Sequence, residues 1–264
     1  MQVVAHRGSS GEQPEHTLAA YKRAIDEGAD ALECDVRLTR DSHLICVHDR
    51  RVDRTSNGRG VVSALELADL ADLDFGSWKP RADEVADDLI AERWEEPDLE
   101  RSRVLTLESL LDMVLAADRP VELAIETKHP TRYAGLVERE LITLLRRMGV
   151  VGRPGVSRVR VMSFASTSLR RVQYLAPMLP TVLLMERVPR RYRDGSLPPR
   201  VTISGPSIAV LRAHPEYVSR VHAAGNAVHV WTVDEPDDIE LAISLGVDAI
   251  ITNHPRRVRE RLAR

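Results

Sequence analysis

The chain has 264 residues, of which 43% are hydrophobic and only 4% aromatic, and its formal net charge is −3. That length suits one α/β unit of barrel size, and the small net charge disfavours binding to nucleic acid. No run of about 18 apolar residues occurs, so we expect no stable membrane insertion. Residues 1–6 do not resemble a secretion signal, and Cys34 and Cys46 lie in apolar runs typical of buried reduced thiols, so a cytoplasmic location is expected.

Short apolar runs alternate with segments of helical period along the chain. The run 3–5 precedes a predicted helix at 17–25, where Leu18, Tyr21 and Ile25 share one face. Strands are predicted at 31–36, 44–48 and 121–126, and the last is followed by a predicted helix at 133–148. In the second half the predicted strands are 159–164, 181–185, 201–204, 227–232 and 249–252, and the predicted helices are 166–175, 207–224, 236–245 and 256–262.

This alternation predicts an α/β fold, a TIM (β/α)8 barrel, because about eight β-then-α units close such a ring. An open doubly wound sheet is the alternative, less favoured because the Gly-rich dinucleotide turn is absent from the sequence. Residues 50–104 are polar and rich in turns, so we interpret them as a small insertion after the second strand. Since no linker divides the sequence, residues 1–264 are expected to form a single domain.

Polar clusters stand at the ends of several predicted strands. The active site of a TIM barrel lies at the carboxyl ends of its strands, and charge at a buried strand end is costly unless it has a partner or a function. We therefore expect these clusters to meet at one mouth. They are His6 with Arg7, Glu33 with Asp35, His48, and Glu126 with Lys128.

The three acids predict a metal site. Glu33 and Asp35 are two apart on a strand, so both point to the same face, about 6–7 Å apart. Glu126 can complete a site of three carboxylates, and oxygen ligands alone favour a hard cation such as Mg²⁺ or Ca²⁺. The alternative is that each acid forms an ordinary salt bridge with a nearby arginine or lysine. Three acids beside two histidines favour the metal.

The remaining polar residues suit cleavage of a phosphate ester. His6 and His48 are the candidates for general acid and base, because imidazole titrates nearest to neutral pH. Zinc ligation by them is less favoured, since no His-x-x-x-His or cysteine pair accompanies them. Arg7 and Lys128 can neutralise the non-bridging phosphate oxygens, Arg7 by bidentate contact and Lys128 as a point charge. Neutralising that charge is the principal task in attacking a phosphodiester.

Eight short motifs occur in the order found in the glycerophosphodiester phosphodiesterases, and the sequence resembles that family over residues 6–255. Single motifs of three residues are weak signals, whereas eight in order are a strong one. The motifs are His6-Arg7-Gly8, Pro14-Glu15-His16-Thr17, Glu33-Cys34-Asp35, Val47-His48-Asp49, Glu126-Thr127-Lys128, Ser163-Phe164, Trp231-Thr232-Val233, and Gly246-Val247-Asp248 through Asn253.

The resemblance implies a TIM barrel with one divalent cation, Mg²⁺ or Ca²⁺, and a small-molecule glycerophosphodiester as substrate. It also implies that Trp231 lines the glycerol side and that Glu15 belongs to the surroundings of the active site. Many members carry Asn where this chain has His16, so the contact made by His16 differs from theirs. The resemblance further implies that the metal is bound by Glu33, Asp35 and Glu126. It implies that His6 and His48 are the general acid/base pair and that Arg7 binds the phosphate.

The implied reaction is metal-dependent hydrolysis of glycerophosphodiesters, such as glycerophosphocholine or glycerophosphoethanolamine, to sn-glycerol 3-phosphate and an alcohol. The alternatives are a phospholipase C-like or sphingomyelinase D-like phosphodiesterase, and a non-catalytic binding relative. The first two are less favoured because no apolar membrane-facing rim is visible in the sequence. The third predicts a missing histidine or acid, and all of them are present.

Overall fold

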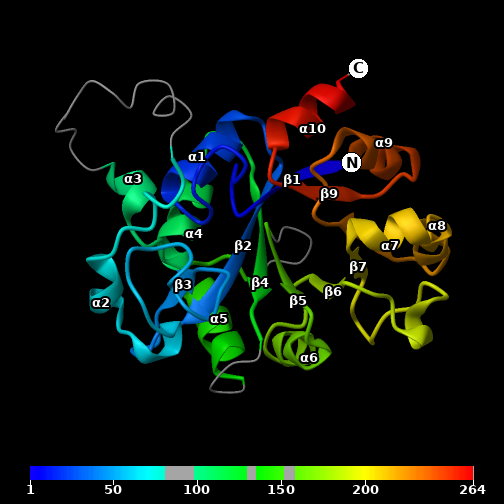
Figure 1. Cartoon of the computed structure of the whole chain (residues 1–264). Coiled ribbons are helices and arrows are strands. Elements are labelled where there is room, and N and C mark those ends of the chain that lie inside the picture. The colour runs from blue at the N-terminus through cyan, green and yellow to red at the C-terminus, as the bar shows by residue number, and fades with distance from the viewer. Residues whose placement is uncertain (81–97, 130–134, 152–157, 264) are drawn as a thin grey trace.

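The computed structural model describes residues 1–80, 98–129, 135–151 and 158–263, and within them eight parallel strands close into a barrel (Figure 1). The order around the ring is β1, β9, β8, β7, β6, β5, β4 and β2, and β2 pairs with β1 to close it. The predicted TIM barrel is thereby confirmed. The strands are β1 (Gln2–His6), β2 (Ala31–Leu38), β4 (Glu122–Thr127), β5 (Val159–Ser163), β6 (Thr181–Met185), β7 (Ile203–Pro206), β8 (Ala227–Val230) and β9 (Ala249–Thr252).

Helices surround the ring on its outer side (Figure 1). Two clusters of aliphatic side chains fill the space between strands and helices, which fits the low aromatic content of the sequence. The sequence did not predict α4, the helix that leads from the insertion into β4. The helices are α1 (Leu18–Asp26), α4 (Leu107–Leu115), α5 (Leu136–Arg147), α6 (Ser166–Leu175), α7 (Ile208–Ala213), α8 (Glu216–Ala223), α9 (Pro236–Ser244) and α10 (Pro255–Leu262).

The prediction of one helix over 207–224 is wrong, because this segment forms the two helices α7 and α8. Pro215 lies between them and disfavours a helical conformation of the preceding residue. His214 accordingly has φ −143° and ψ 68°, outside the helical region. Of the predicted helix 133–148, residues 133 and 134 lie outside the described part of the chain, and α5 covers most of the rest.

Inside the barrel, small aliphatic residues give way to charged ones toward the mouth. Successive side chains on a strand point to opposite faces, so every second residue of a barrel strand faces the interior. Val4, Ala31 and Ala124 belong to the buried interior cluster. The same inward rows continue two residues later with His6 on β1, Glu33 on β2 and Glu126 on β4.

The prediction of a barrel strand at 44–48 is wrong. The shorter β3 (Leu44–Cys46) lies outside the ring and pairs antiparallel with β2, with Leu44 opposite Leu38 and Cys46 opposite Val36. The chain thus runs back along β2 toward the mouth, and the Val47 N–H donates to the Asp35 carbonyl at 3.0 Å. This return brings His48 to the mouth, although His48 was predicted at the end of a barrel strand and β3 is not one.

The insertion after β3 has a small core of its own. Val52, Val62, Leu70 and Phe75 are buried there against Ile45 of β3. Residues 81–97 of the predicted insertion lie outside the described residues. The described part contains a 3-10 turn, η1 (Val62–Ala64), and the short helices α2 (Leu67–Ala71) and α3 (Leu99–Ser102).

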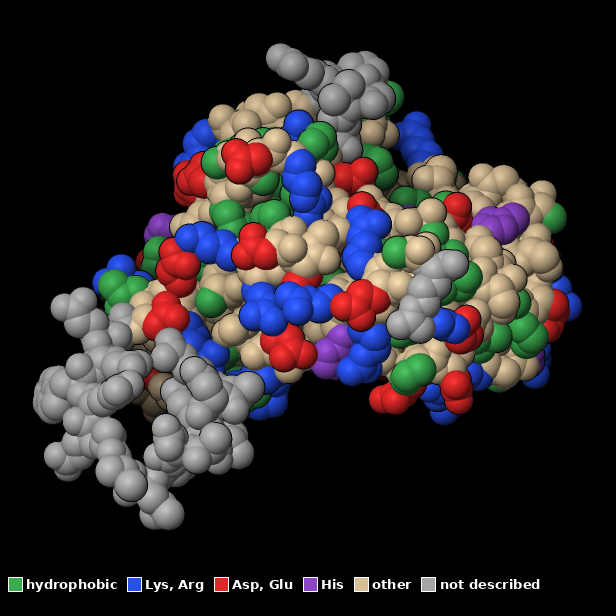
Figure 2. Space-filling model, turned by 90° about the horizontal axis from the view of Figure 1, so that it is seen from above, with side chains coloured by type: hydrophobic (Ala, Val, Ile, Leu, Met, Phe, Trp, Pro, Cys, Tyr) green, Lys and Arg blue, Asp and Glu red, His purple; other side chains and the backbone are tan. Residues whose placement is uncertain are grey.

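The outer surface is highly charged and of mixed sign. Figure 2 shows acidic and basic side chains interspersed across the face seen from above, in keeping with the small net charge. None of the helices in the described ranges is long and apolar enough to cross a bilayer.

Candidate functional site

One cavity of about 150 Å³ at the carboxyl ends of the strands brings together most of the predicted site residues. The predicted Asp35 lies fully buried beside this cavity, within the acid cluster, and Glu15 lies behind Arg7. The cavity is lined by His6, Arg7, Glu33, His48, Glu126, Lys128 and Trp231, together with Met162, Phe164, Leu184, Glu186, Thr232 and Ile251.

The three predicted metal ligands form a tight buried cluster. Glu33, Asp35 and Glu126 each offer a carboxylate oxygen, and these oxygens lie within 4.8 Å of one another. Burial and the charge of Asp35 raise the pKa of Glu33 well above its usual range. The same two causes raise the pKa of Glu126 to about 8. A donor set of three hard oxygens fits a divalent cation such as Mg²⁺ or Ca²⁺, which would offset this repulsion.

Salt bridges are also present. The alternative that each acid pairs with a nearby arginine or lysine therefore holds in part. Arg7 Nε lies 3.0 Å from Asp35 Oδ2, and Lys128 Nζ lies 3.0 Å from Asp35 Oδ1 and 2.8 Å from Glu126 Oε1. Glu33 accepts a hydrogen bond from the backbone N–H of Arg7 at 3.1 Å. When all three acids are ionised, the two cationic side chains leave the cluster with one uncompensated negative charge.

A tight turn after β1 directs Arg7 back over the acids. Arg7 has φ +58° and Gly8 has φ +84°, a region in which glycine is preferred. A Cβ atom on Gly8 would lie 2.6 Å from the backbone carbon of Ala20, so only glycine fits there without a shift of the chain. The turn lets Arg7 Nη1 donate to Glu15 Oε1 at 3.0 Å while Nε faces Asp35.

His16 contacts the acid cluster from behind. Its side chain is 5% exposed, and its Nε2 lies 2.9 Å from Asp35 Oδ2. Its Nδ1 lies 2.8 Å from the hydroxyl of Tyr21, which in turn donates to the Glu33 carbonyl at 3.1 Å. Although burial opposes it, the hydrogen bond from His16, with Lys128 and Arg7, holds the pKa of Asp35 well below its usual range.

Each of the two candidate acid/base histidines is held through Nδ1. His6 Nδ1 lies 2.8 Å from Asn253 Oδ1, and His48 Nδ1 lies 2.7 Å from Asp49 Oδ1. Burial and the neighbouring Arg7 lower the pKa of His6 to about 4. Burial also lowers the pKa of His48. Both rings are therefore neutral near pH 7 in this arrangement.

A network of charged side chains joins the insertion to the mouth. Arg54 Nε donates to Asp49 Oδ2 at 2.6 Å, and its two terminal nitrogens donate to Glu15 at 2.8 and 2.7 Å. Glu15 accepts in turn from Arg7. The partner roles of Asp49, Arg54 and Asn253 were not predicted from the sequence. The position of Asp49 directly after His48 was the only local signal for any of them.

The aromatic wall of the cavity comes from the ends of β5 and β8. Trp231 is half-buried, its indole N–H donates to the Gly205 carbonyl at 2.7 Å, and Phe164 meets its ring edge-on with centroids 5.4 Å apart. Phe164 is 44% exposed, and Glu186, which follows β6, is exposed as well. Among the residues described, none forms an ion pair with the Glu186 carboxylate.

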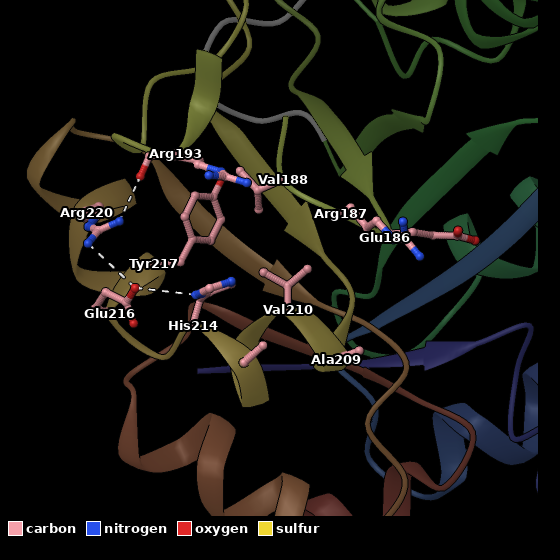
Figure 3. Close-up of a pocket in the computed structure, with 11 residues that line it drawn as sticks. Glu186, Arg187, Val188, Arg193, Ala209, Val210, His214, Glu216, Tyr217 and Arg220 are labelled. Atoms are coloured by element: carbon pink, nitrogen blue, oxygen red, sulfur yellow. Dashed lines mark hydrogen bonds and ion pairs between the residues drawn. The ribbon is translucent and has the colours of Figure 1, made fainter. Parts of the chain in front are cut away.

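A larger cavity of about 510 Å³ lies between the β6–β7 connection and the helices α7 and α8 (Figure 3). That connection contains only a 3-10 turn, η3 (Arg190–Tyr192), in the place of a barrel helix. Three polar side chains of this cavity are paired, since Glu216 lies 3.7 Å from His214 and 3.6 Å from Arg220. Glu186 lines both cavities, and its carboxylate points away from Tyr217, His214 and Arg220 in Figure 3.

Comparison with known proteins identifies one enzyme family over nearly the whole chain. The model of the glycerophosphoryl diester phosphodiesterase family matches residues 6–257. A Mycobacterium tuberculosis protein named probable glycerophosphodiester phosphodiesterase 1 is 47% identical over 97% of this chain and 90% of its own length. The glycerophosphodiester phosphodiesterase of Bacillus subtilis is 35% identical over 96% of this chain and 83% of its own length.

Solved structures share the fold. An Oleispira antarctica phosphodiesterase, determined in complex with the product sn-glycerol-3-phosphate, aligns with a TM-score of 0.82 at 23% identity over 100% of this chain and 97% of its own. A putative glycerophosphoryl diester phosphodiesterase from Silicibacter pomeroyi aligns with a TM-score of 0.80 at 25% identity, over 100% and 93%.

The acid cluster predicts a stability that depends on pH and on metal. Because the pKa of Glu126 in the folded, metal-free chain lies near 8 and above its ordinary 4.5, stability falls as pH rises through that interval. Glu126→Gln cannot ionise, so in chelator its Tm should exceed the wild-type Tm at pH 9 and approach it at pH 5. Added Mg²⁺ or Ca²⁺ should raise the wild-type Tm and that of the variant much less.

Glu122→Gln is the matched control, since Glu122 lies at the other end of the same strand and pairs with Arg160 at 2.6 Å. It should lose stability at both pH values and keep the full metal-dependent rise in Tm. A Glu126→Gln variant with an unchanged metal response would contradict the assignment of this ligand.

Proposed function

The chain belongs to the glycerophosphoryl diester phosphodiesterase family, and on that basis we propose that it hydrolyses glycerophosphodiesters to sn-glycerol 3-phosphate and an alcohol in a metal-dependent reaction. The observation that carries the proposal is one cavity lined by His6, His48, two of three clustered buried acids, and the cations Arg7 and Lys128. We propose that residues 1–264 act as one domain, with 50–104 as its insertion. A cytoplasmic location is still an expectation from the sequence.

We assign the metal to the acid cluster. Glu33, Asp35 and Glu126 would hold one divalent cation, Mg²⁺ or Ca²⁺, which when bound neutralises charge on the phosphate and polarises it. Arg7 and Lys128 reach the same cavity and would neutralise non-bridging oxygens. Glu15 does not line the cavity, so its proposed role is to hold Arg7 in position through their 3.0 Å contact.

We assign proton transfer to the two histidines. With Nδ1 occupied by Asn253 in His6 and by Asp49 in His48, the Nε2 atom of each ring is the one available for proton transfer. One histidine, in its neutral form, takes a proton from the attacking hydroxyl at Nε2. The other must already carry a second proton, on Nε2, and gives that proton to the leaving alcohol. Trp231 would line the glycerol side of the bound substrate.

Chelation and substrate choice test the activity itself. We expect the protein to release sn-glycerol 3-phosphate from glycerophosphocholine, to lose this activity in excess EDTA, and to regain it with Mg²⁺ or Ca²⁺. Full turnover after rigorous chelation would contradict the metal site. A preference for intact phospholipid would favour the phospholipase C-like or sphingomyelinase D-like alternative, and binding of glycerophosphodiesters without turnover would favour a non-catalytic relative.

Replacement of the histidines tests the acid/base assignment. His6→Ala and His48→Ala should each lower turnover by roughly 10²–10⁴, the usual contribution of such groups. The control is His43→Ala, because His43 is exposed and pairs with Asp41 away from the cavity. Turnover is measured as sn-glycerol 3-phosphate released at saturating metal. A near-normal rate for either variant would remove that residue from proton transfer.

We further propose that the head group of the substrate is a cationic alcohol, such as choline or ethanolamine. Glu186 and the exposed ring of Phe164 stand on the rim of the cavity, outside the half-buried Trp231. A carboxylate without an ion-pair partner in the described chain and an aromatic face both attract an ammonium group. This rim lies at the ends of β5 and β6, apart from the acids of β2 and β4.

Glu186→Gln should therefore discriminate between substrates. It should lower kcat/KM for glycerophosphocholine and glycerophosphoethanolamine by about 3- to 30-fold, which corresponds to about 0.7–2 kcal/mol. The rate with a neutral head group such as glycerol should stay within twofold. Glu216→Gln is the control, since Glu216 lines only the larger cavity of Figure 3. An equal loss on cationic and neutral substrates would contradict a charge-selective rim.

A further inference from the structure

The amide of Asn253 meets His6 across two neighbouring strands of the barrel. Asn253 follows β9, and the pairing of Ala5 with Thr252 sets His6 and Asn253 side by side at the mouth. Asn253 Oδ1 lies 2.8 Å from His6 Nδ1, and the hydroxyl of Ser10 lies 2.7 Å from the same oxygen. His6 is thus held from the side opposite to the acid cluster.

Asp234 fixes which way this amide points. Asn253 Nδ2 donates to Asp234 Oδ2 at 2.6 Å, and the backbone N–H of Asn253 donates to Asp234 Oδ1 at 2.8 Å. The hydroxyl of Thr252 also donates to Asp234 Oδ1, at 3.0 Å. An ionised carboxylate only accepts hydrogen bonds. The nitrogen of the amide must therefore face Asp234, and the oxygen must face His6.

This orientation determines the tautomer of His6. An amide oxygen only accepts hydrogen bonds, so the neutral imidazole must carry its proton on Nδ1 and keep a lone pair on Nε2. We propose that Asp234 and Asn253 are positioning residues that fix the tautomer and orientation of the His6 ring, so that Nε2 faces the substrate for proton transfer. The proposal rests on the acid/base function assigned to His6 above.

The charges around His6 explain why its partner is an amide, that of Asn253, and not a carboxylate. His6 Nε2 lies 4.0 Å from Glu33 Oε2, and Glu33 belongs to the cluster of three acids. A carboxylate in place of Asn253 could accept the same hydrogen bond from His6, but it would add a fourth acid to this part of the mouth and set its second oxygen against Asp234. The amide keeps the hydrogen bond without that charge, and Asp234 contacts Asn253 through the other end of the amide.

The first test reads the tautomer directly and needs no turnover. In protein labelled with ¹⁵N at histidine, the two ring-nitrogen shifts show which nitrogen carries the proton, and His6→Ala identifies the His6 signals. At pH 8 we expect the wild-type His6 ring to be protonated at Nδ1, and Asn253→Ala to show a mixture of the two tautomers. A wild-type ring protonated at Nε2 would overturn the proposal, whatever the protein hydrolyses.

The second test asks whether the two residues act through His6. At saturating Mg²⁺ with glycerophosphocholine, Asn253→Ala should lower kcat about 10- to 100-fold, the range seen for outer-shell partners, and leave KM within threefold. Asp234→Asn should also lower kcat, but by less than Asn253→Ala. The side-chain amide of Asn253 can then flip between two orientations, and only one of them presents its oxygen to His6. The double variant His6→Ala/Asn253→Ala should be no slower than His6→Ala alone, since groups acting as a unit are not additive.

The controls separate this proposal from the proposed function and from misfolding. Asn253→Ala should keep the metal-dependent rise in Tm, because it leaves the three acids intact. A further 10-fold loss in the double variant, or a near-normal kcat for Asn253→Ala, would overturn the positioning role. Wild-type protein that hydrolyses no glycerophosphodiester would instead contradict the proposed function and leave the tautomer reading standing.

Discussion

The mouth of the barrel is governed by the repulsion among three buried carboxylates. Glu33, Asp35 and Glu126 bring their oxygens within 4.8 Å of one another, an arrangement that water cannot screen. Arg7 and Lys128 compensate two of the three charges. With the three acids ionised, one divalent cation would bring the set of three acids, Arg7 and Lys128 to a single net positive charge. A phosphodiester carries one negative charge, so such a mouth would match its substrate in charge.

The acids and their grouping could be predicted from the sequence because they depend on two local rules. Alternation along a strand places Glu33 and Asp35 on one face, and closure of parallel strands brings Glu126 to the same level. Neither rule needs knowledge of a side-chain contact. His48 was predicted at the mouth from a wrong premise, namely that 44–48 is a parallel barrel strand. A short apolar run does not reveal whether its strand is parallel or antiparallel. The antiparallel β3 returns the chain to the mouth all the same.

The partners of the catalytic candidates could not be predicted, because they come from distant parts of the chain. Arg54 reaches Glu15 across 39 positions, and Asn253 reaches His6 across 247. Such contacts depend on the register of whole strands and on the path of the insertion, which periodicity does not specify. The same holds for the β6–β7 connection, where a loop in place of a barrel helix leaves the cavity of Figure 3.

The two histidines show how the acid cluster constrains its surroundings. Both rings are held at Nδ1 by an oxygen that accepts, so both present Nε2, yet the oxygen belongs to an amide beside His6 and to a carboxylate beside His48. Asp49 pairs with Arg54 at 2.6 Å, and this cation offsets the added negative charge. At position 253 a carboxylate would lie across the His6 ring from Glu33 and directly against Asp234. Electrostatic repulsion around the acid cluster therefore explains why two histidines proposed for the same chemical task are held by different partners.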